Sequence, residues 1–124
     1  MRIAVSATEP SLNASVDPRF GRCAYFVIVD TETMKFEVVP NTSLSAPHGA
    51  GIQSAQMLAN KDVKVVLTGN VGPNAYSSLS AAGIHIITGA TGTVRETIER
   101  YKRGELGEAR SPTVRGHFGL NKGL

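Results

Sequence analysis

The chain has 124 residues, 41% of them hydrophobic and 19% charged, which is the size of one folded domain and too apolar for a chain disordered throughout. Its single cysteine, Cys23, excludes an intrachain disulfide and the paired thiolates of common zinc and iron–sulfur motifs. No apolar run approaches the roughly 18 residues that span a membrane, and the N-terminus turns polar too early for a secretory signal. We therefore expect a cytoplasmic protein with no membrane partner.

The formal net charge of +3 lies mostly at the C-terminal end. Residues 108–124 contain Arg110, Arg115 and Lys122 against Glu108, a net charge of +2, so the rest of the chain is close to neutral. Binding to a phosphate backbone needs lysines and arginines clustered on one face, and the sequence shows no such cluster outside one predicted helix that also carries acidic residues. We expect no nucleic-acid partner.

Apolar runs bounded by polar or glycine-containing segments predict five strands. Ile3–Ser6 and Tyr25–Asp30 are the first two, and Lys35–Val39 follows closely enough to form a hairpin with the second. Val63–Thr68 and Ile84–Thr88 are almost continuously apolar, which is typical of parallel strands covered on both faces.

Three helices are predicted between and after these strands. Ile52–Asn60 has apolar residues at helical spacing, and Pro73–Ala82 begins with a proline, which suits the first position of a helix. Thr93 and Glu96 form a T-x-x-E capping box, which predicts a third helix that ends near Gly104.

The order β-β-β-α-β-α-β-α predicts a three-layer α/β/α domain with a five-stranded mixed sheet. With the first strand between the hairpin and the crossover strands, the sheet order is 3-2-1-4-5 and the second strand is antiparallel. Ligands favour the crevice beside the first strand in such a sheet. We expect residues 1–107 to form this domain and residues 108–124 to form a flexible basic tail, because apolar periodicity ends there.

Three loops leave the carboxyl ends of the parallel strands and should meet at one rim: Ala7–Gly21, Gly69–Gly72 and Gly89–Gly92. The last two lead directly into helices, whose free N–H groups and positive ends suit an anion. Arginines in the first loop would add cationic groups. Alternatively, the glycines only form tight turns and the arginines are only solvated, since neither loop has the Walker or the full G-x-G-x-x-G pattern. The candidate anion-binding residues are Arg19, Arg22, Gly69, Asn70, Gly72, Asn74, Gly89, Thr91, Gly92 and Thr93.

Three residues are candidate metal ligands. Cys23 follows the two arginines, so that its thiolate is stabilised by them, or it is a small buried residue at the start of a strand. His48 precedes the glycines before the first helix and is either a metal ligand or a plain loop histidine. His117 reaches the rim only if the tail folds back. His85 lies inside a predicted strand, where we expect it to pack or to form a hydrogen bond.

The residues for hydrolysis are missing from the places where they would be needed. Ile3–Ser6 contains no carboxylate for a two-metal nuclease, and the sequence has no G-x-S-x-G motif. Asp17 is a lone acidic residue in the loop that follows. The sequence therefore predicts a binding protein and not an enzyme.

Six separated motifs, in order over about residues 1–106, resemble the dinitrogenase iron-molybdenum cofactor biosynthesis family, which includes NifX, NafY and the C-terminal domain of NifB. These motifs are DPRFGR, YFVIVD, GAGIQSAQML, TGNVGPNA, AAGI and GATGTVRE. The resemblance implies a ribonuclease H-like α/β/α fold. It also implies a role in carrying iron–sulfur precursors of the nitrogenase cofactor, which are anionic. Cys23 stands where the family usually has alanine.

Two hypotheses follow from the residues and the resemblance together. The first is a non-catalytic carrier of an iron–sulfur or iron–molybdenum-type cluster, with cluster-assembly proteins as partners. The second is a metal-free module that binds an anionic ligand or another protein at the same rim.

Overall fold

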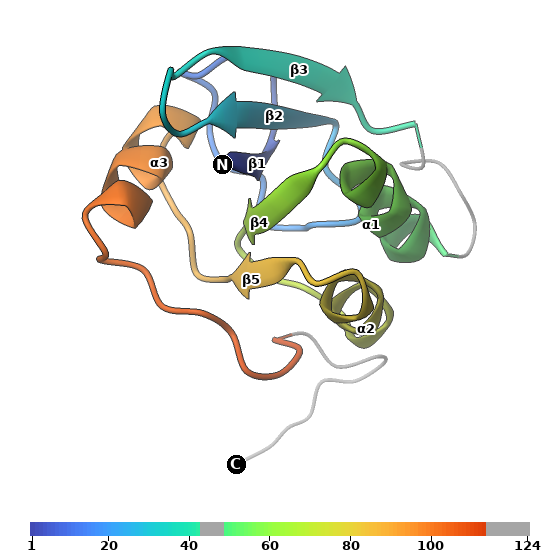
Figure 1. Cartoon of the computed structure of the whole chain (residues 1–124). Coiled ribbons are helices and arrows are strands. Elements are labelled where there is room, and N and C mark those ends of the chain that lie inside the picture. Colours follow the sequence, from blue (N-terminus) through green and yellow to red (C-terminus); the bar gives the residue numbers. More distant parts are fainter. Residues whose placement is uncertain (43–48, 114–124) are drawn as a thin grey trace.

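A computed structural model of the chain describes residues 1–42 and 49–113 (Figure 1). Its five-stranded sheet has the order β3-β2-β1-β4-β5, and β2 is antiparallel to both of its neighbours, whereas β1, β4 and β5 are parallel. The strands are β1 (Arg2–Ala7), β2 (Tyr25–Asp30), β3 (Phe36–Pro40), β4 (Val63–Leu67) and β5 (His85–Ile87). The predicted fold class, strand order and antiparallel strand are confirmed.

The helices lie on both sides of this sheet. Figure 1 shows α1 (Ala50–Asn60) and α2 (Pro73–Ala81) on one side and α3 (Val94–Lys102) on the other. The first helix begins two residues before the predicted start at Ile52, because Gly49 takes a left-handed conformation with φ of 74° and turns the chain into the helix. None of the helices in residues 1–42 and 49–113 is long and apolar enough to cross a membrane.

Two apolar clusters separate the three layers. Val5, Val27 and Leu67 face α3, where they pack with Val94 and Ile98. The other cluster packs α1 and α2 on the opposite face of the same strands, and its members include Ala4, Phe26, Ile28, Leu58, Val66 and Leu79. Neighbouring residues of a strand point to opposite faces, so burial of both faces explains the continuous apolar runs.

The segment after α3 lies against the edge of the sheet. Ala109 N donates to Ile86 O at 2.7 Å, and Thr113 N donates to Val71 O at 3.0 Å. The edge strand β5 has backbone groups that need partners, and this segment supplies some of them. Residues 108–113 of the predicted tail are therefore attached to the domain, while residues 114–124 lie outside the described residues and their flexibility stays a prediction.

Helices α1 and α2 approach each other closely through two small residues. A Cβ atom added to Gly51 would lie 2.8 Å from the Cβ of Ala75, which is closer than side chains can pack. The two helices therefore depend on one of these positions having no side chain.

We predict strong coupling between Gly51 and Ala75. Gly51→Ala should lower the free energy of unfolding, and adding Ala75→Gly should recover space, with a coupling of about 1 kcal/mol or more because overpacking costs about 1 to 3 kcal/mol. Urea denaturation of the wild type, the two single variants and the double variant gives this coupling. Additive effects of the two substitutions would contradict the contact.

Candidate functional site

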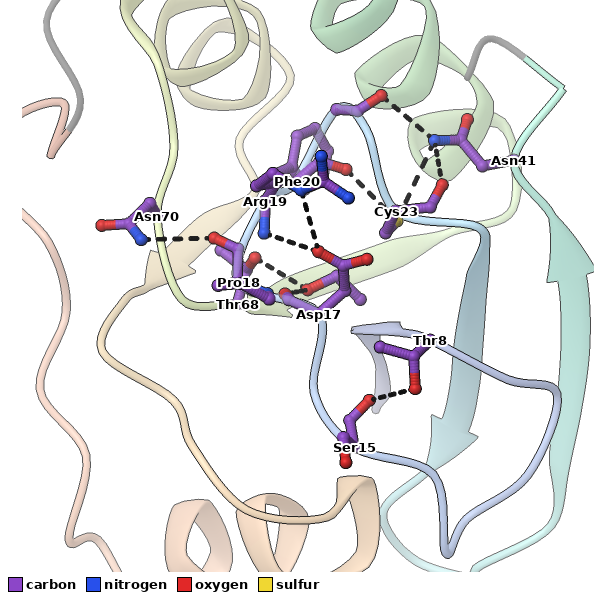
Figure 2. Close-up of polar contacts among 12 residues, drawn as sticks. Thr8, Ser15, Asp17, Pro18, Arg19, Phe20, Cys23, Asn41, Thr68 and Asn70 are labelled. Carbon is purple, nitrogen blue, oxygen red and sulfur yellow. Dashed lines mark hydrogen bonds and ion pairs between the residues drawn. The ribbon is translucent and has the colours of Figure 1, made fainter. Parts of the chain in front are cut away.

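The loops that follow β1 and β4 are joined by backbone hydrogen bonds. The side-chain amide of Asn70 also donates to Pro18 O at 3.3 Å (Figure 2). Asn70 N donates to Pro18 O at 2.7 Å, and Phe20 N donates to Asn70 O at 3.2 Å. Gly69 permits this approach, because a Cβ atom there would lie 2.6 Å from the Cα of Pro18. Arg19 consequently lies beside Asn70 at the carboxyl edge of the sheet.

The loop after β5 joins the same edge. Gly89 N donates to Gly69 O at 2.9 Å, and Ala90 N donates to Thr68 O at 3.0 Å. Thr91 is exposed, and its carbonyl accepts hydrogen bonds from Thr97 Oγ1 and from the guanidinium of Arg100. The three loops thus meet, as the strand order predicted; we call this edge the rim.

A buried polar network holds the rim from below. The Ser6 hydroxyl donates to Asp17 O at 2.7 Å and lies 2.7 Å from Thr68 Oγ1. Both hydroxyl side chains are fully buried. Sequence reasoning missed this network, although polar residues at the ends of two apolar strands are a signal for it, because buried hydroxyls need partners.

The carboxylate of Asp17 fixes the position of Arg19. Asp17 Oδ1 accepts a hydrogen bond from Arg19 N at 2.9 Å and lies 3.5 Å from Arg19 Nε (Figure 2). The Asp17 side chain is 7% exposed and that of Arg19 is 67% exposed. A buried acidic group therefore holds one side of an arginine that faces solvent, and Arg22 is exposed on the same loop.

The N-termini of α1 and α2 lie at the rim. Their N-cap residues, Gly49 and Gly72, form no side-chain cap. Within the described part of the chain, the N–H groups of Asn74 and Ala75 have no acceptor. A Cβ atom on Gly21 would lie 3.0 Å from Gly51 N, so the start of α1 packs directly on the arginine-bearing loop. The two helices therefore direct their positive ends toward the region of Arg19 and Arg22.

The N-terminus of α3 is closed by the loop after β1. Val94 N donates to Ala14 O at 2.9 Å. Arg95 N donates to Leu12 O at 2.9 Å. These carbonyls occupy the positions that an anion would need at the start of this helix.

The capping box at α3 is confirmed, and it pairs two more backbone N–H groups at the start of this helix. Thr93 N donates to Glu96 Oε1 at 2.9 Å, and Glu96 N donates to Thr93 Oγ1 at 3.1 Å. The prediction that the helix after Gly89–Gly92 has free N–H groups at its start is therefore wrong. Gly92 and Thr93 belong to the closed end of α3, and α1 takes its place at the rim.

Cys23 lies in the core and not at the rim. Its side chain is fully buried, and its Sγ donates to Phe20 O at 3.3 Å. Burial, assisted by the negative charge of Asp17, raises the pKa of the Cys23 thiol to about 12. The thiolate that a metal needs is strongly disfavoured, so the prediction of an arginine-stabilised ligand is corrected in favour of a small buried residue.

Asn41 is a buried residue that the sequence did not single out. Its side-chain amide donates to Cys23 O at 2.8 Å and to Gly21 O at 3.2 Å. The Ser54 hydroxyl in turn donates to Asn41 Oδ1 at 3.1 Å (Figure 2 shows the amide bonds). Asn41 thereby ties the end of β3 and the arginine-bearing loop to α1.

The histidines do not form a metal centre in the described residues. His48 and His117 lie outside them, and the side chain of His85 is 63% exposed, with its Nδ1 2.9 Å from Glu108 Oε2. Residues 1–42 and 49–113 contain no group of three or more histidine, cysteine, aspartate or glutamate residues that could hold a metal ion.

Comparison with known proteins identifies the family. Residues 1–104 match the family described as dinitrogenase iron-molybdenum cofactor. The chain belongs to this family. An uncharacterized protein of Methanocaldococcus jannaschii is 35% identical to the chain over 100 residues, which is 78% of this chain and 85% of that protein.

Solved structures of similar proteins share the fold. The apo form of the orange protein from Desulfovibrio gigas is 47% identical, with a TM-score of 0.89, over 91% of this chain and 96% of that one. A putative NifB protein from Thermotoga is 39% identical, with a TM-score of 0.77, over 86% of this chain and 91% of that one. The family links the chain to the iron–molybdenum cofactor, and its matched range contains the sheet and all the rim loops.

We predict that Gly69 and Gly72 tolerate alanine very differently. Gly69→Ala should lower the free energy of unfolding by about 1 to 3 kcal/mol, because its Cβ would contact the backbone of Pro18. Gly72→Ala is the matched control, since nothing lies within 4 Å of a Cβ there. Urea denaturation measures both variants, and equal stabilities would contradict the joined loops.

We predict a loss of stability at high pH that depends on Cys23. The pKa of this thiol is about 12 in the folded state and near 9.0 ordinarily, so its contribution is complete below pH 9 and is lost as pH rises toward 12. Between pH 8 and pH 10.5 the wild type should lose about 1 to 2 kcal/mol more than Cys23→Ala, since each pKa unit corresponds to about 1.4 kcal/mol. Urea denaturation at the two pH values measures the difference, and parallel losses would show that the thiol is not buried.

Proposed function

We propose that the protein is a non-catalytic carrier of an anionic iron–sulfur or iron–molybdenum-type cluster, or of a precursor of one. The observation that carries this proposal is that the loop with Arg19 and Arg22 and the N-termini of α1 and α2 lie together at one rim. Membership of a family named for the iron–molybdenum cofactor supplies the class of cargo.

The described residues favour binding by charge and hydrogen bonds. The N–H groups of Asn74 and Ala75, the amide of Asn70 and the guanidinium of Arg19 are donors, and sulfides of a cluster are acceptors. Each helix end contributes about 0.3 to 1 kcal/mol toward an anion at an exposed site, and an arginine adds charge-assisted hydrogen bonds. His48 directly precedes Gly49 at the start of α1 and is our proposed iron ligand.

Two findings support reversible binding of the cargo. The orange protein from Desulfovibrio gigas has a structure determined in its apo form, which denotes a protein without its bound group. In this chain three of the residues that carry donors at the rim, Arg19, Asn70 and Asn74, are exposed. We include cluster-assembly proteins as partners and the cytoplasm as the location in this proposal.

One observation favours a second candidate, a metal-free module that binds a phosphate-bearing metabolite or an acidic loop of a partner. No group of three potential metal ligands occurs among the described residues, and Cys23 is buried. Helix N-termini and arginines would bind such an anion by the same donors.

Anaerobic reconstitution with ferrous iron and sulfide tests the carrier. The wild type should gain a charge-transfer absorption and retain it after desalting. Arg19→Gln with Arg22→Gln should release the cluster about tenfold faster, because charge-assisted hydrogen bonds are lost. Arg103→Gln is the matched control, because Arg103 follows α3 at the opposite end of the sheet.

Four further results distinguish the hypotheses. His48→Ala should lower the retained iron if His48 is a ligand, whereas Cys23→Ser should leave it unchanged. Absence of any charge-transfer absorption would overturn the carrier. Stabilisation in metal-free buffer by a phosphate-bearing metabolite, about 2.7 kcal/mol at 100 times its dissociation constant, would then support the second candidate.

A further inference from the structure

A C-terminal strap, residues 108–113, lies beyond the family match and crosses from the edge of the sheet to the rim. In Figure 1 the chain after α3 passes β5 and ends its coloured part near α2. Its first contact is a short antiparallel bridge between Glu108 and Ile87, with Ala109 N donating to Ile86 O at 2.7 Å. Its second contact is at Val71.

Thr113 binds both backbone groups of Val71. Thr113 N donates to Val71 O at 3.0 Å, and Val71 N donates to Thr113 Oγ1 at 2.9 Å. Val71 itself is 1% exposed. On one side of Val71 is Asn70, which is bonded to the arginine-bearing loop, and on the other is Gly72, the N-cap of α2.

We propose that Thr113 is a positioning residue for the rim. By fixing both polar groups of the Val71 backbone, it holds Asn70 against the arginine-bearing loop and orients the first N–H groups of α2. This inference rests on the proposed function in one respect only: an anion bound to these donors leaves more slowly when Thr113 keeps them in place.

Few interactions attach the strap to the other described residues, so Thr113 contributes a large share of that attachment. The contact of His85 Nδ1 with Glu108 Oε2 joins side chains that are 63% and 54% exposed, and such surface contacts contribute little. Ala109 is half-buried, whereas Arg110, Ser111 and Pro112 are exposed. An element with so little buried surface opens locally more easily than the core. The strap therefore stays in place mainly through the hydrogen bonds of Thr113 with Val71.

The test compares three variants of the full chain. Thr113→Val removes the hydroxyl and keeps the shape, Thr113→Ser restores the hydroxyl, and Ser111→Ala removes a hydroxyl elsewhere on the strap. Amide hydrogen exchange reports on Asn70 and Phe20, whose N–H groups do not contact Thr113 but depend on the position of Val71. Release of the cluster reconstituted from ferrous iron and sulfide, or of inorganic phosphate if no cluster forms, reports on the rim.

Thr113→Val should speed exchange at Asn70 and Phe20 and release of the probe by about three- to tenfold, as expected for the loss of one net hydrogen bond. Thr113→Ser and Ser111→Ala should match the wild type. If exchange at these amides is unchanged, the proposal is overturned. If the wild type binds neither probe, the proposed function fails, and the exchange data alone decide whether Thr113 positions the rim. Faster exchange with unchanged release would limit Thr113 to a structural role and overturn the proposal as well.

Discussion

The close approach of Gly69 to Pro18 is the constraint on which the rim depends. A side chain at Gly69 would occupy the space of the Pro18 backbone, so the two hydrogen bonds of Asn70 with Pro18 and Phe20 can form only with glycine there. These bonds join two loops into one unit that is bonded to the third loop through Gly89. Backbone geometry, more than side-chain chemistry, thus determines where Arg19 lies.

The rim is asymmetric because the start of α3 is closed, whereas the N–H groups of Asn74 and Ala75 in α2 have no acceptor among the described residues. Carbonyls of the loop after β1 bind the first N–H groups of α3, which removes its positive end from any ligand. The N-cap residues of α1 and α2 form no side-chain cap. Gly21 lets the start of α1 pack on the arginine-bearing loop, and Gly51 lets α1 approach Ala75 of α2. Asp17 places a negative charge under this region, yet its contact with Arg19 N and Nε shows that it orients the arginine.

The sequence predicted the features of the fold that depend on local residue patterns and on the rules for connecting strands. Five apolar runs and the crossover rule led to the observed sheet order, and the capping box of Thr93 and Glu96 is where the pattern placed it. The sequence could not decide whether Cys23 is buried. Only the packing of the loop under Asn41 and α1 decides whether a residue at the start of a strand faces the core or the rim. The closure of α3 likewise depends on carbonyls some 80 residues away in the chain, at Leu12 and Ala14.

The attachment of the strap could not be predicted from the sequence, for a different physical reason. Residues 108–113 have no apolar periodicity, because their attachment uses backbone groups of an edge strand and one threonine hydroxyl. Such an attachment has almost no effect on amino-acid composition, and breaking it costs little free energy. If the rim carries an anionic cluster without a dense set of protein ligands, the lifetime of the complex depends on how well the donors are held in place. A weakly attached element next to those donors is then where release is most readily controlled, since it can open while both apolar clusters of the domain stay intact.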